Sequence, residues 1–370
     1  MNIISRILIN LFTLICILFV QTLPEAAEDV NLEVVDSFKA DCAQLAENAR
    51  GLSVVGDEGW LFSKNELRHI SVGEFWGESA GMISRAKRVE RRDPLPAIVD
   101  FKERLDRLGI ELIFLPIPPK AMIYPDKISE SIRAKYGKDS PRLDIHHQQF
   151  YRILRDKGIN VIDLVPEFLT NRYDQKGYLY CKTDTHWSGL ASIRATKLIA
   201  LELKNKAWMK DITKKRFDAD YRTVRIRGDL LRELQEQEGI EDEKLELRFV
   251  GTRTSNGLKP VDPNPNSPVI LMADSHGLIF HVGGDMLAHG AGLADQLALD
   301  LGFPVDLIAV RGSGATPARV NLYRRAKKEG YLAKKKVLIW CIAAREFTES
   351  VDGWGKVPVL KKTNPESNKN

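Results

Sequence analysis

The chain has little excess charge of either sign. Its 55 Lys and Arg against 50 Asp and Glu leave a net charge of +5, and the basic residues are spread along all 370 positions. This balance lacks the clustered basic surface that is typical of nucleic-acid binding, so we expect no nucleic-acid partner. The charge would suit a polyanionic substrate but does not by itself indicate one. No internal repeats stand out.

Long apolar runs are also scarce. The only one follows Arg6 and covers residues 7–20, and it ends in a small-residue stretch that reaches Ala27. This pattern is typical of a signal peptide, and the run is short for a membrane span, which needs about 20 apolar residues. Residues 1–27 are therefore predicted to be a signal peptide or an uncleaved signal anchor. The protein is expected to be exported, and to contact a membrane only if the anchor is retained.

Cysteine is rare, with 4 residues in the whole chain. Cys16 lies in the apolar run, which leaves Cys42, Cys181 and Cys341 in the exported part. Disulfides can form outside the cytoplasm, and Cys42–Cys181 is the pairing we predict, because it would clamp the N-terminal segment beside residue 184. Cys341 lies in an apolar strand pattern and is expected to behave as a small buried hydrophobe. An odd number of thiols cannot all pair.

Helical and strand patterns alternate through most of the sequence. Strands are expected at 110–118, 159–164, 268–272, 306–310 and 336–342, and helices at 29–50, 95–108, 141–157, 289–301 and 316–328. A further helix is expected after Ser188, which can serve as its N-cap. Strands that alternate with helices indicate an α/β fold with a parallel sheet and right-handed crossovers.

One stretch breaks this alternation. Residues 205–265 are charged, with an acidic run and a Pro/Asn-rich end. We interpret them as an insertion that packs on the core of a single domain spanning 28–360. This insertion could also border the substrate site. The Lys/Asn-rich residues 361–370 are predicted to be a disordered tail.

Asp184 and His186 are the first candidate functional residues. Two residues apart, they cannot face each other on a helix. In a loop, however, the carboxylate can fold back onto one imidazole nitrogen and leave the other free to accept a proton from a hydroxyl, as in a Ser-His-Asp triad. Two alternatives stay open: a metal site, for which further ligands at plausible spacing are missing, and a purely structural pair.

Ser275 is the candidate hydroxyl. It follows a predicted buried strand, at the edge where parallel sheets bind their ligands. Gly277 allows a tight turn after it. A serine at a strand end can equally be a cap. Gly312 and Gly314 follow the next strand and could lend a backbone N–H to an oxyanion hole. A phosphate cradle is the other possibility, although the Lys-Ser/Thr of a Walker motif is missing.

The order of these blocks carries a family resemblance. A strand ending in Asp-Ser, then a strand ending in Gly, then a third strand resembles the SGNH (GDSL-type) hydrolases. In that family an Asp-x-x-His block comes last, whereas here Asp184-x-His186 comes first and is one residue shorter. The order therefore looks like a circularly permuted SGNH domain, and it resembles the AlgJ/AlgX family of periplasmic polysaccharide O-acetylation proteins. Further local matches are Gly59-Trp-Leu-Phe62, Pro118-Pro-Lys120, Tyr180-Cys-Lys-Thr-Asp-Thr-His-Trp187 and the stretch 289–297.

The resemblance implies a three-layer α/β/α domain in the periplasm that transfers acetyl groups to an exopolysaccharide such as alginate. Ser275 would be the acylated nucleophile, His186 the general base and acid, and Asp184 its orienter. Gly312 or Gly314 would help to hold the oxyanion. It also implies a membrane-bound O-acyltransferase partner that supplies acetyl groups, and no cofactor or metal is expected.

Four points stay open at this stage. Many SGNH enzymes have an oxyanion-hole Asn after the third strand, whereas this chain has Ala343-Ala-Arg345. Arg345 could replace the Asn, bind a uronate carboxylate, or form an ordinary surface ion pair. Trp187 is grouped with the oxyanion and substrate-binding candidates, although its position favours a role in fixing the loop. The triad does not distinguish an acetyltransferase from an acetylesterase, and the missing Asn would suit a catalytically weak polysaccharide-binding or assembly subunit.

Overall fold

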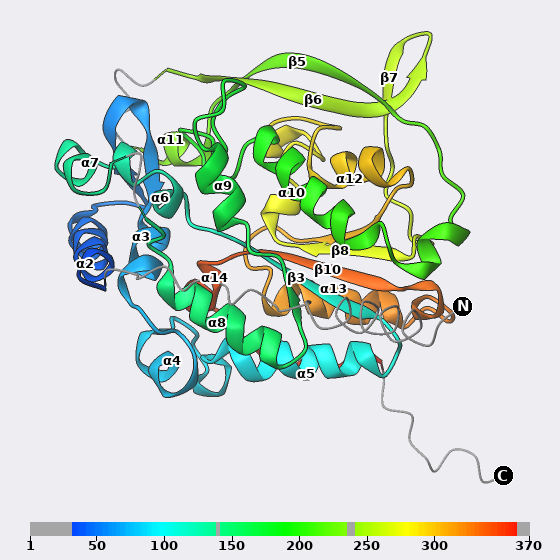
Figure 1. The fold of residues 1–370 in the computed structure, drawn as a ribbon, viewed down its shortest axis with the longest axis horizontal. Helices are drawn as coiled ribbons and strands as arrows, with labels where there is room; N and C mark the ends of the chain where they lie inside the picture. The colour runs from blue at the N-terminus through cyan, green and yellow to red at the C-terminus, as the bar shows by residue number, and fades with distance from the viewer. Residues whose placement is uncertain (1–31, 138–140, 235–240, 361–370) are drawn as a thin grey trace, which may run out of the picture. The chain divides into compact units, whose positions relative to one another are not determined.

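A five-stranded parallel sheet forms the centre of the domain (Figure 1). The computed structural model describes residues 32–137, 141–234 and 241–360. The strands are β3 (Glu111–Ile117), β4 (Asn160–Val161), β8 (Val269–Ala273), β9 (Asp306–Ala309) and β10 (Val337–Ala343), in the order β4-β3-β10-β8-β9. The predicted parallel α/β fold is confirmed. The predictions for residues 1–27 and 361–370 lie outside the described residues.

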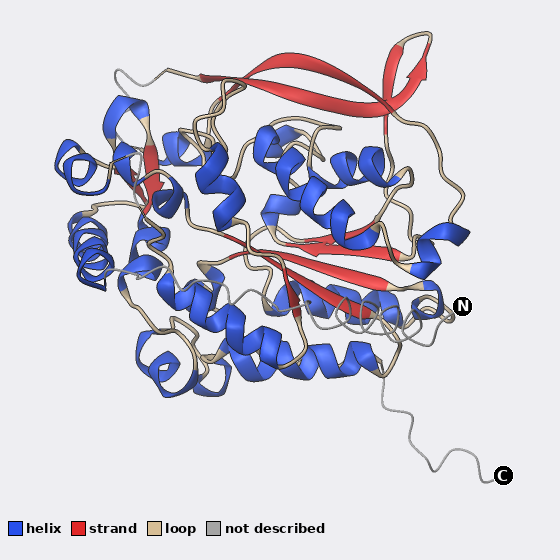
Figure 2. Ribbon diagram, in the orientation of Figure 1, coloured by secondary structure: helices blue, strands red, loops and turns tan. Residues whose placement is uncertain are grey.

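Both faces of this sheet are buried, because successive side chains of a strand point to opposite sides. On one face, Ile113, Leu271 and Ile339 pack with the helices α10 (Gly189–Leu203) and α12 (Leu293–Leu301). On the other, their strand neighbours pack with α5 (Pro94–Asp106), α8 (Ile145–Asp156) and α13 (Thr316–Ala326). The result is the three-layer α/β/α arrangement, with helices on both sides of the sheet (Figure 2).

Further elements, most of them from the N-terminal half of the chain, lie beside the carboxyl ends of the strands. These are α2 (Leu32–Asn48), the antiparallel pair β1 (Ser53–Val55) and β2 (Leu61–Ser63), α3 (Lys64–Ser71), α4 (Gly77–Ile83), α6 (Lys120–Ile123), α7 (Glu130–Tyr136), α9 (Val165–Asn171) and α14 (Glu346–Glu349). Several of them contribute to the same core cluster as the α10 face of the sheet, through Phe38, Phe62 and Phe168. They therefore extend the core at this end of the sheet.

The described residues of the 205–265 segment include a second, antiparallel sheet. Its strands β5 (Asp218–Ile226), β6 (Glu243–Thr254) and β7 (Gly257–Pro260) cross the top of the view in Figure 1. The helix α11 (Asp229–Glu233) lies between the first two of these strands in sequence. Leu247 of β6 packs on the first turn of α10, where a Cβ on Gly189 would come within 2.6 Å of it. The segment is thus docked on the helix that follows the Asp184 loop.

Several predicted elements are shorter than expected, among them the helix predicted at 141–157, which covers Ile145–Asp156. The strand predicted at 159–164 is confined to Asn160–Val161, because Asp163 turns the chain by accepting a hydrogen bond from the Val165 N–H at the start of α9. The helix predicted at 289–301 begins only at Leu293. Gly290 has φ +91°, which is not a helical conformation. Gly292 is the N-cap of the helix, and its N–H donates to the Asp295 carboxylate.

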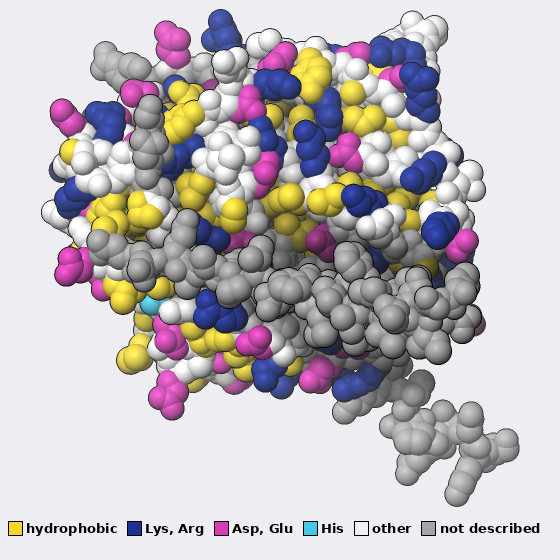
Figure 3. All heavy atoms as spheres, in the orientation of Figure 1, with side chains coloured by type: hydrophobic (Ala, Val, Ile, Leu, Met, Phe, Trp, Pro, Cys, Tyr) yellow, Lys and Arg dark blue, Asp and Glu magenta, His cyan; other side chains and the backbone are white. Residues whose placement is uncertain are grey.

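Charges of both signs share the surface above α10 and α12. Figure 3 shows Lys and Arg interspersed with Asp and Glu on that face. This is the distribution expected from the small net charge. Within residues 32–137, 141–234 and 241–360, no helix has both the length and the apolar character that a membrane span requires.

Candidate active site

The Asp184 loop is a tight excursion with pinned ends. Tyr180 and Trp187 form an antiparallel bridge, and the Cys181 N–H donates to the His186 carbonyl. After the loop, the Ser188 hydroxyl accepts from the Ala191 N–H and so caps α10, as predicted. The loop is therefore held between a bridge and a helix start, which fixes the direction of its side chains.

Asp184, His186 and Ser275 form one hydrogen-bonded chain. His186 Nδ1 lies 2.6 Å from Asp184 Oδ1, and His186 Nε2 lies 2.8 Å from Ser275 Oγ. A carboxylate can only accept, so Nδ1 carries the proton and the Nε2 of the neutral ring accepts from the serine hydroxyl. The structure thus brings together three residues that sequence reasoning had linked across a separation of 89 positions.

The electrostatics hold this arrangement in a reactive state. Burial alone would raise the pKa of Asp184, but the hydrogen bond and charge of His186, with the backbone N–H groups of Asp229 and His186, lower it below its usual value. Burial opposes protonation of His186, yet the carboxylate of Asp184 outweighs it and raises the pKa of the ring. Asp184 therefore stays ionised, and a protonated His186 would be stabilised after it has taken a proton.

Ser275 sits where β8 ends, in a tight 3-10 turn. The Gly277 position has no room for a side chain, since a Cβ there would come within 2.5 Å of the Ala273 Cβ. The preceding Asp274 accepts hydrogen bonds from the His276 N–H and ring and from the Ala343 N–H. These contacts tie the serine turn to the end of β10. Burial lowers the pKa of His276 to about 4, so this second ring is neutral beside His186, with centroids 4.7 Å apart.

A cavity of about 300 Å³ opens onto the serine and histidine. Gly312 and Arg345 line it, as the sequence suggested. Gly314 and Trp187 do not. Gly314 is packed against Asp274, where a Cβ would lie 2.9 Å from the Asp274 Cβ, and Trp187 is fully buried with its ring edge toward His276. Trp187 thus supports the loop from behind. A larger cavity of about 560 Å³ lies near Lys182 and Glu243, but neither Ser275 nor His186 lines it.

The structure excludes one of the three interpretations of Arg345, an ordinary surface ion pair. Its side chain is 17% exposed, and it pairs at 3.3 Å with Glu66, which is buried. Glu66 in turn accepts from the Lys120 N–H. Arg345 therefore presents a fixed positive charge to the cavity, at the chain position where many SGNH enzymes have an Asn.

The predicted Cys42–Cys181 disulfide is wrong. Cys42, Cys181 and Cys341 are all free and buried. Cys42 belongs to the packed face of α2, whereas the Cys181 thiol is directed at the Trp187 carbonyl, 3.6 Å away. The two thiols serve separate local contacts. Cys341 is a buried core residue of β10, as expected.

Lys120 was not recognised as a site residue from the sequence. It is fully buried, and its Nζ donates to the carbonyls of Leu61, Cys181 and Asp184 at 2.6–2.8 Å. The lysine thus ties β2 to the Asp184 loop through the Cys181 and Asp184 carbonyls. Its presence in the Pro118-Pro-Lys120 motif was the available signal.

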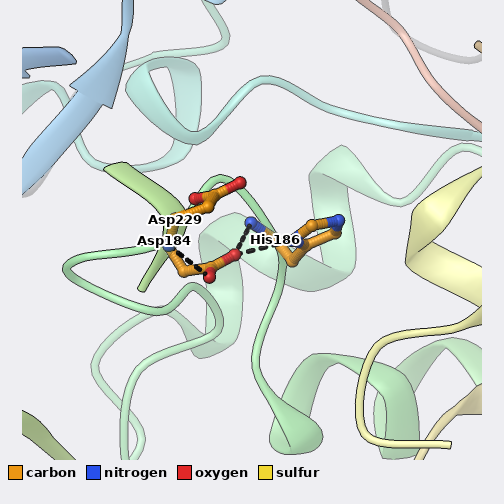
Figure 4. Close-up of side chains that lie close together, drawn as sticks. All are labelled: Asp184, His186 and Asp229. Atoms are coloured by element: carbon orange, nitrogen blue, oxygen red, sulfur yellow. Dashed lines mark hydrogen bonds and ion pairs between the residues drawn. The ribbon is translucent and has the colours of Figure 1, made fainter. Parts of the chain in front are cut away.

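Asp229, from α11, is the other residue that was missed. Figure 4 shows it approaching Asp184 and His186 from a separate segment. One oxygen or nitrogen atom from each of the three residues lies within 4.8 Å of the others, a spacing that could suit a metal ion. The carboxylates are already occupied, however. Asp184 accepts from His186 and the Asp229 N–H, and Asp229 accepts from Thr185. The donor set therefore does not fit a metal without breaking this network.

Comparison with known families identifies the family of the chain. Residues 54–344 match the family described as the SGNH hydrolase-like domain, acetyltransferase AlgX. The chain belongs to this family.

Curated relatives of this AlgX-family chain align over shorter stretches. The probable alginate O-acetylase AlgJ of Pseudomonas aeruginosa is 26% identical over 153 residues, which is 41% of this chain and 33% of AlgJ. The alginate biosynthesis protein AlgX of the same organism is 28% identical over 118 residues, 32% of this chain and 24% of AlgX. The matched part thus spans about a third or less of these relatives.

Solved structures extend the likeness of the fold over most of the chain. The O-acetyltransferase domain of Pseudomonas putida AlgJ superposes with a TM-score of 0.58 at 18% identity, covering 82% of this chain and 94% of that domain. Pseudomonas aeruginosa AlgX gives 0.58 at 19% identity, covering 84% and 65%. The SGNH-like architecture of this AlgX-family domain is therefore shared with both.

Proposed function

We propose that this protein is an exported serine-dependent O-acetyltransferase that acts on an exopolysaccharide such as alginate. The observation that carries the proposal is the Asp184–His186–Ser275 chain at the edge of a cavity. Membership of the AlgX family and the names of the relatives, alginate O-acetylase AlgJ among them, support the acetyl group and the polymer. The signal-peptide-like N-terminus supports export to the periplasm.

The first half-reaction acetylates the serine. Ser275 Oγ attacks the acetyl carbonyl of a donor while His186 Nε2 takes its proton. The tetrahedral intermediate then collapses, the protonated His186 returns the proton to the departing donor group, and acetyl-Ser275 is left. Asp184 keeps the ring in the tautomer that this proton transfer needs and stabilises the charged imidazolium.

The oxyanion needs donors beside Ser275 Oγ. We assign the Ser275 and Gly312 N–H groups to this role, because Gly312 lines the cavity whereas Gly314 is packed behind it. The Arg345 guanidinium supplies a positive charge on the same cavity. It can face either the oxyanion or the carboxylate of a uronate unit.

In the second half-reaction a sugar hydroxyl attacks acetyl-Ser275. His186 takes the hydroxyl proton and returns it to Ser275 as the ester leaves, which regenerates the enzyme. Water in place of the sugar would make the protein an acetylesterase, since both reactions pass through the same intermediate. We favour transfer because of the family, with a membrane-bound O-acyltransferase as the acetyl source.

The test uses purified protein and a small aryl acetate. Ser275→Ala and His186→Ala should each fold, judged by circular dichroism, and lose at least about a thousandfold in acetyl release. Ser131→Ala, on the exposed α7 surface, is the matched control and should keep full activity. Undiminished turnover in both site variants would refute the proposal. Supplying deacetylated polymer with the donor then separates transfer, which yields polymer acetate, from hydrolysis, which yields free acetate.

A further inference from the structure

The turn that carries Asp229 lies in direct contact with the Asp184 loop. The Leu231 N–H donates to the Thr183 carbonyl, and the Gly228 N–H donates to the Thr183 hydroxyl. A Cβ on Gly228 would lie 2.0 Å from the Thr183 carbonyl oxygen, so the backbones touch and only glycine fits there. The 205–265 segment therefore reaches the site through residues 228–231.

Asp229 binds the loop on two sides. Its N–H donates to Asp184 Oδ2 at 2.8 Å, on the oxygen that His186 does not use. Its carboxylate accepts from the Thr185 N–H at 2.7 Å and from the Thr185 hydroxyl at 2.6 Å. Asp229 thus fixes the residue before His186 and the second oxygen of Asp184 at the same time, and it lines the cavity beside Ser275.

On the basis of the function proposed above, we propose that Asp229 is a positioning residue for the acyl-transfer reaction, supplied by the 205–265 segment. It orients Asp184 through its backbone N–H and Thr185 through its carboxylate. It also places a second negative charge next to the imidazole that becomes protonated during the reaction. The antiparallel segment is then an integral part of the catalytic apparatus and not only a border of the site.

The charges that face His186 come from several elements. Asp184 lies on its own loop, Asp229 on α11, Arg345 after β10, and the neutral ring of His276 in the serine turn. Against the effect of burial, Asp184 and Asp229 raise the pKa of His186, whereas Arg345 lowers it. Neutralising Asp229 removes one of the two favourable charges, so His186 should lose its proton at a lower pH.

Asp229→Asn tests the charge of the carboxylate, and Asp229→Ala tests its two hydrogen bonds with Thr185. The asparagine keeps an oxygen for the Thr185 N–H, so the variant should fold and retain activity at high pH. The acidic limb of its kcat/KM profile for the aryl acetate should move to lower pH than in the wild type. Alanine leaves the Thr185 groups without an acceptor and should lower kcat at least about tenfold with little change in KM. Asp220→Asn is the charge-matched control. Asp220 lies on β5 and forms an exposed pair with Arg253 of β6, so this variant should leave the profile unchanged.

The outcomes separate this inference from the underlying function. If Ser275→Ala and His186→Ala are inactive while both Asp229 variants keep the wild-type profile and kcat, Asp229 is not a positioning residue and only this inference fails. If Ser275→Ala and His186→Ala remain active, the proposed function itself fails. A general loss of stability in Asp229→Ala would lower activity without moving the pH limb, so the limb of the well-folded Asp229→Asn variant decides.

Discussion

Replacing Lys120 by methionine should weaken both the fold and the site. The buried ammonium donates to the carbonyls of Leu61, Cys181 and Asp184, with the Lys182 carbonyl at 3.3 Å. Methionine fills most of the volume but leaves these acceptors without a donor, and a buried group that loses its partner costs about 1–3 kcal/mol. Burial of the ammonium lowers the pKa of Lys120, so removing the charge returns part of that cost.

Three carbonyls lose their donor at about 1–3 kcal/mol each, and the desolvation cost recovered from the ammonium offsets part of this, so the net expectation is a loss of about 3–5 kcal/mol in the free energy of unfolding. For a chain of this length that corresponds to a fall in Tm of roughly 4–7 °C. Acetyl release should also fall, because the Asp184 carbonyl is one of the freed acceptors. Differential scanning calorimetry and the aryl acetate assay measure the two effects.

Lys135→Met is the matched control, since this lysine pairs with Asp41 at the surface and should contribute less than about 1 kcal/mol. A Lys120→Met protein that melts within about 1 °C of wild type and turns over normally would refute the reasoning.

Two further predictions concern the loop contact and pH. Gly228→Ala should cost about 1–3 kcal/mol by overpacking against the Thr183 carbonyl, and it should reduce acetyl release. Gly81→Ala, in α4 with open space around it, should instead stabilise by up to about 1 kcal/mol in urea unfolding, because alanine favours the helix. A similar change in stability in the two variants would contradict the contact. Burial lowers the pKa of His147 to about 3, so its native ring stays neutral while the unfolded chain binds a proton below about pH 6.5. The free energy of unfolding is therefore unaffected by this histidine above about pH 6.5. Below that pH it falls by up to about 1.4 kcal/mol per pH unit, until the pH reaches the pKa of His147 in the folded protein. Urea unfolding at pH 7 and pH 5 should show a smaller loss in His147→Gln than in wild type, and an equal loss would count against this assignment.

The central sheet and the candidate residues Asp184, His186 and Ser275 were predictable because local patterns indicate them. Buried strands such as Val337–Ala343 are continuous apolar runs, and Asp184 and His186 lie close enough in sequence to suggest a pair. The family order of the blocks then connected the pair to Ser275. In each case the signal lies within a few residues or in the order of the elements.

The supporting residues could not be predicted in the same way. Asp229 belongs to an insertion and contacts Thr185, which is 44 positions away in sequence. Glu66 pairs with Arg345, which is 279 positions away. Such contacts depend on how elements dock, which periodicity does not encode. The cysteine pairing failed for the same reason, since the loop is held by the buried Lys120 and not by a disulfide.

The central claim is that Ser275 carries the acetyl group during turnover. Intact-mass measurement with peptide mapping, after brief incubation of the protein with an aryl acetate, tests it most directly. The account predicts one added acetyl group, located on Ser275 and absent from Ser275→Ala. Continued acetyl release with no adduct on Ser275, or with the adduct on another residue, would contradict it.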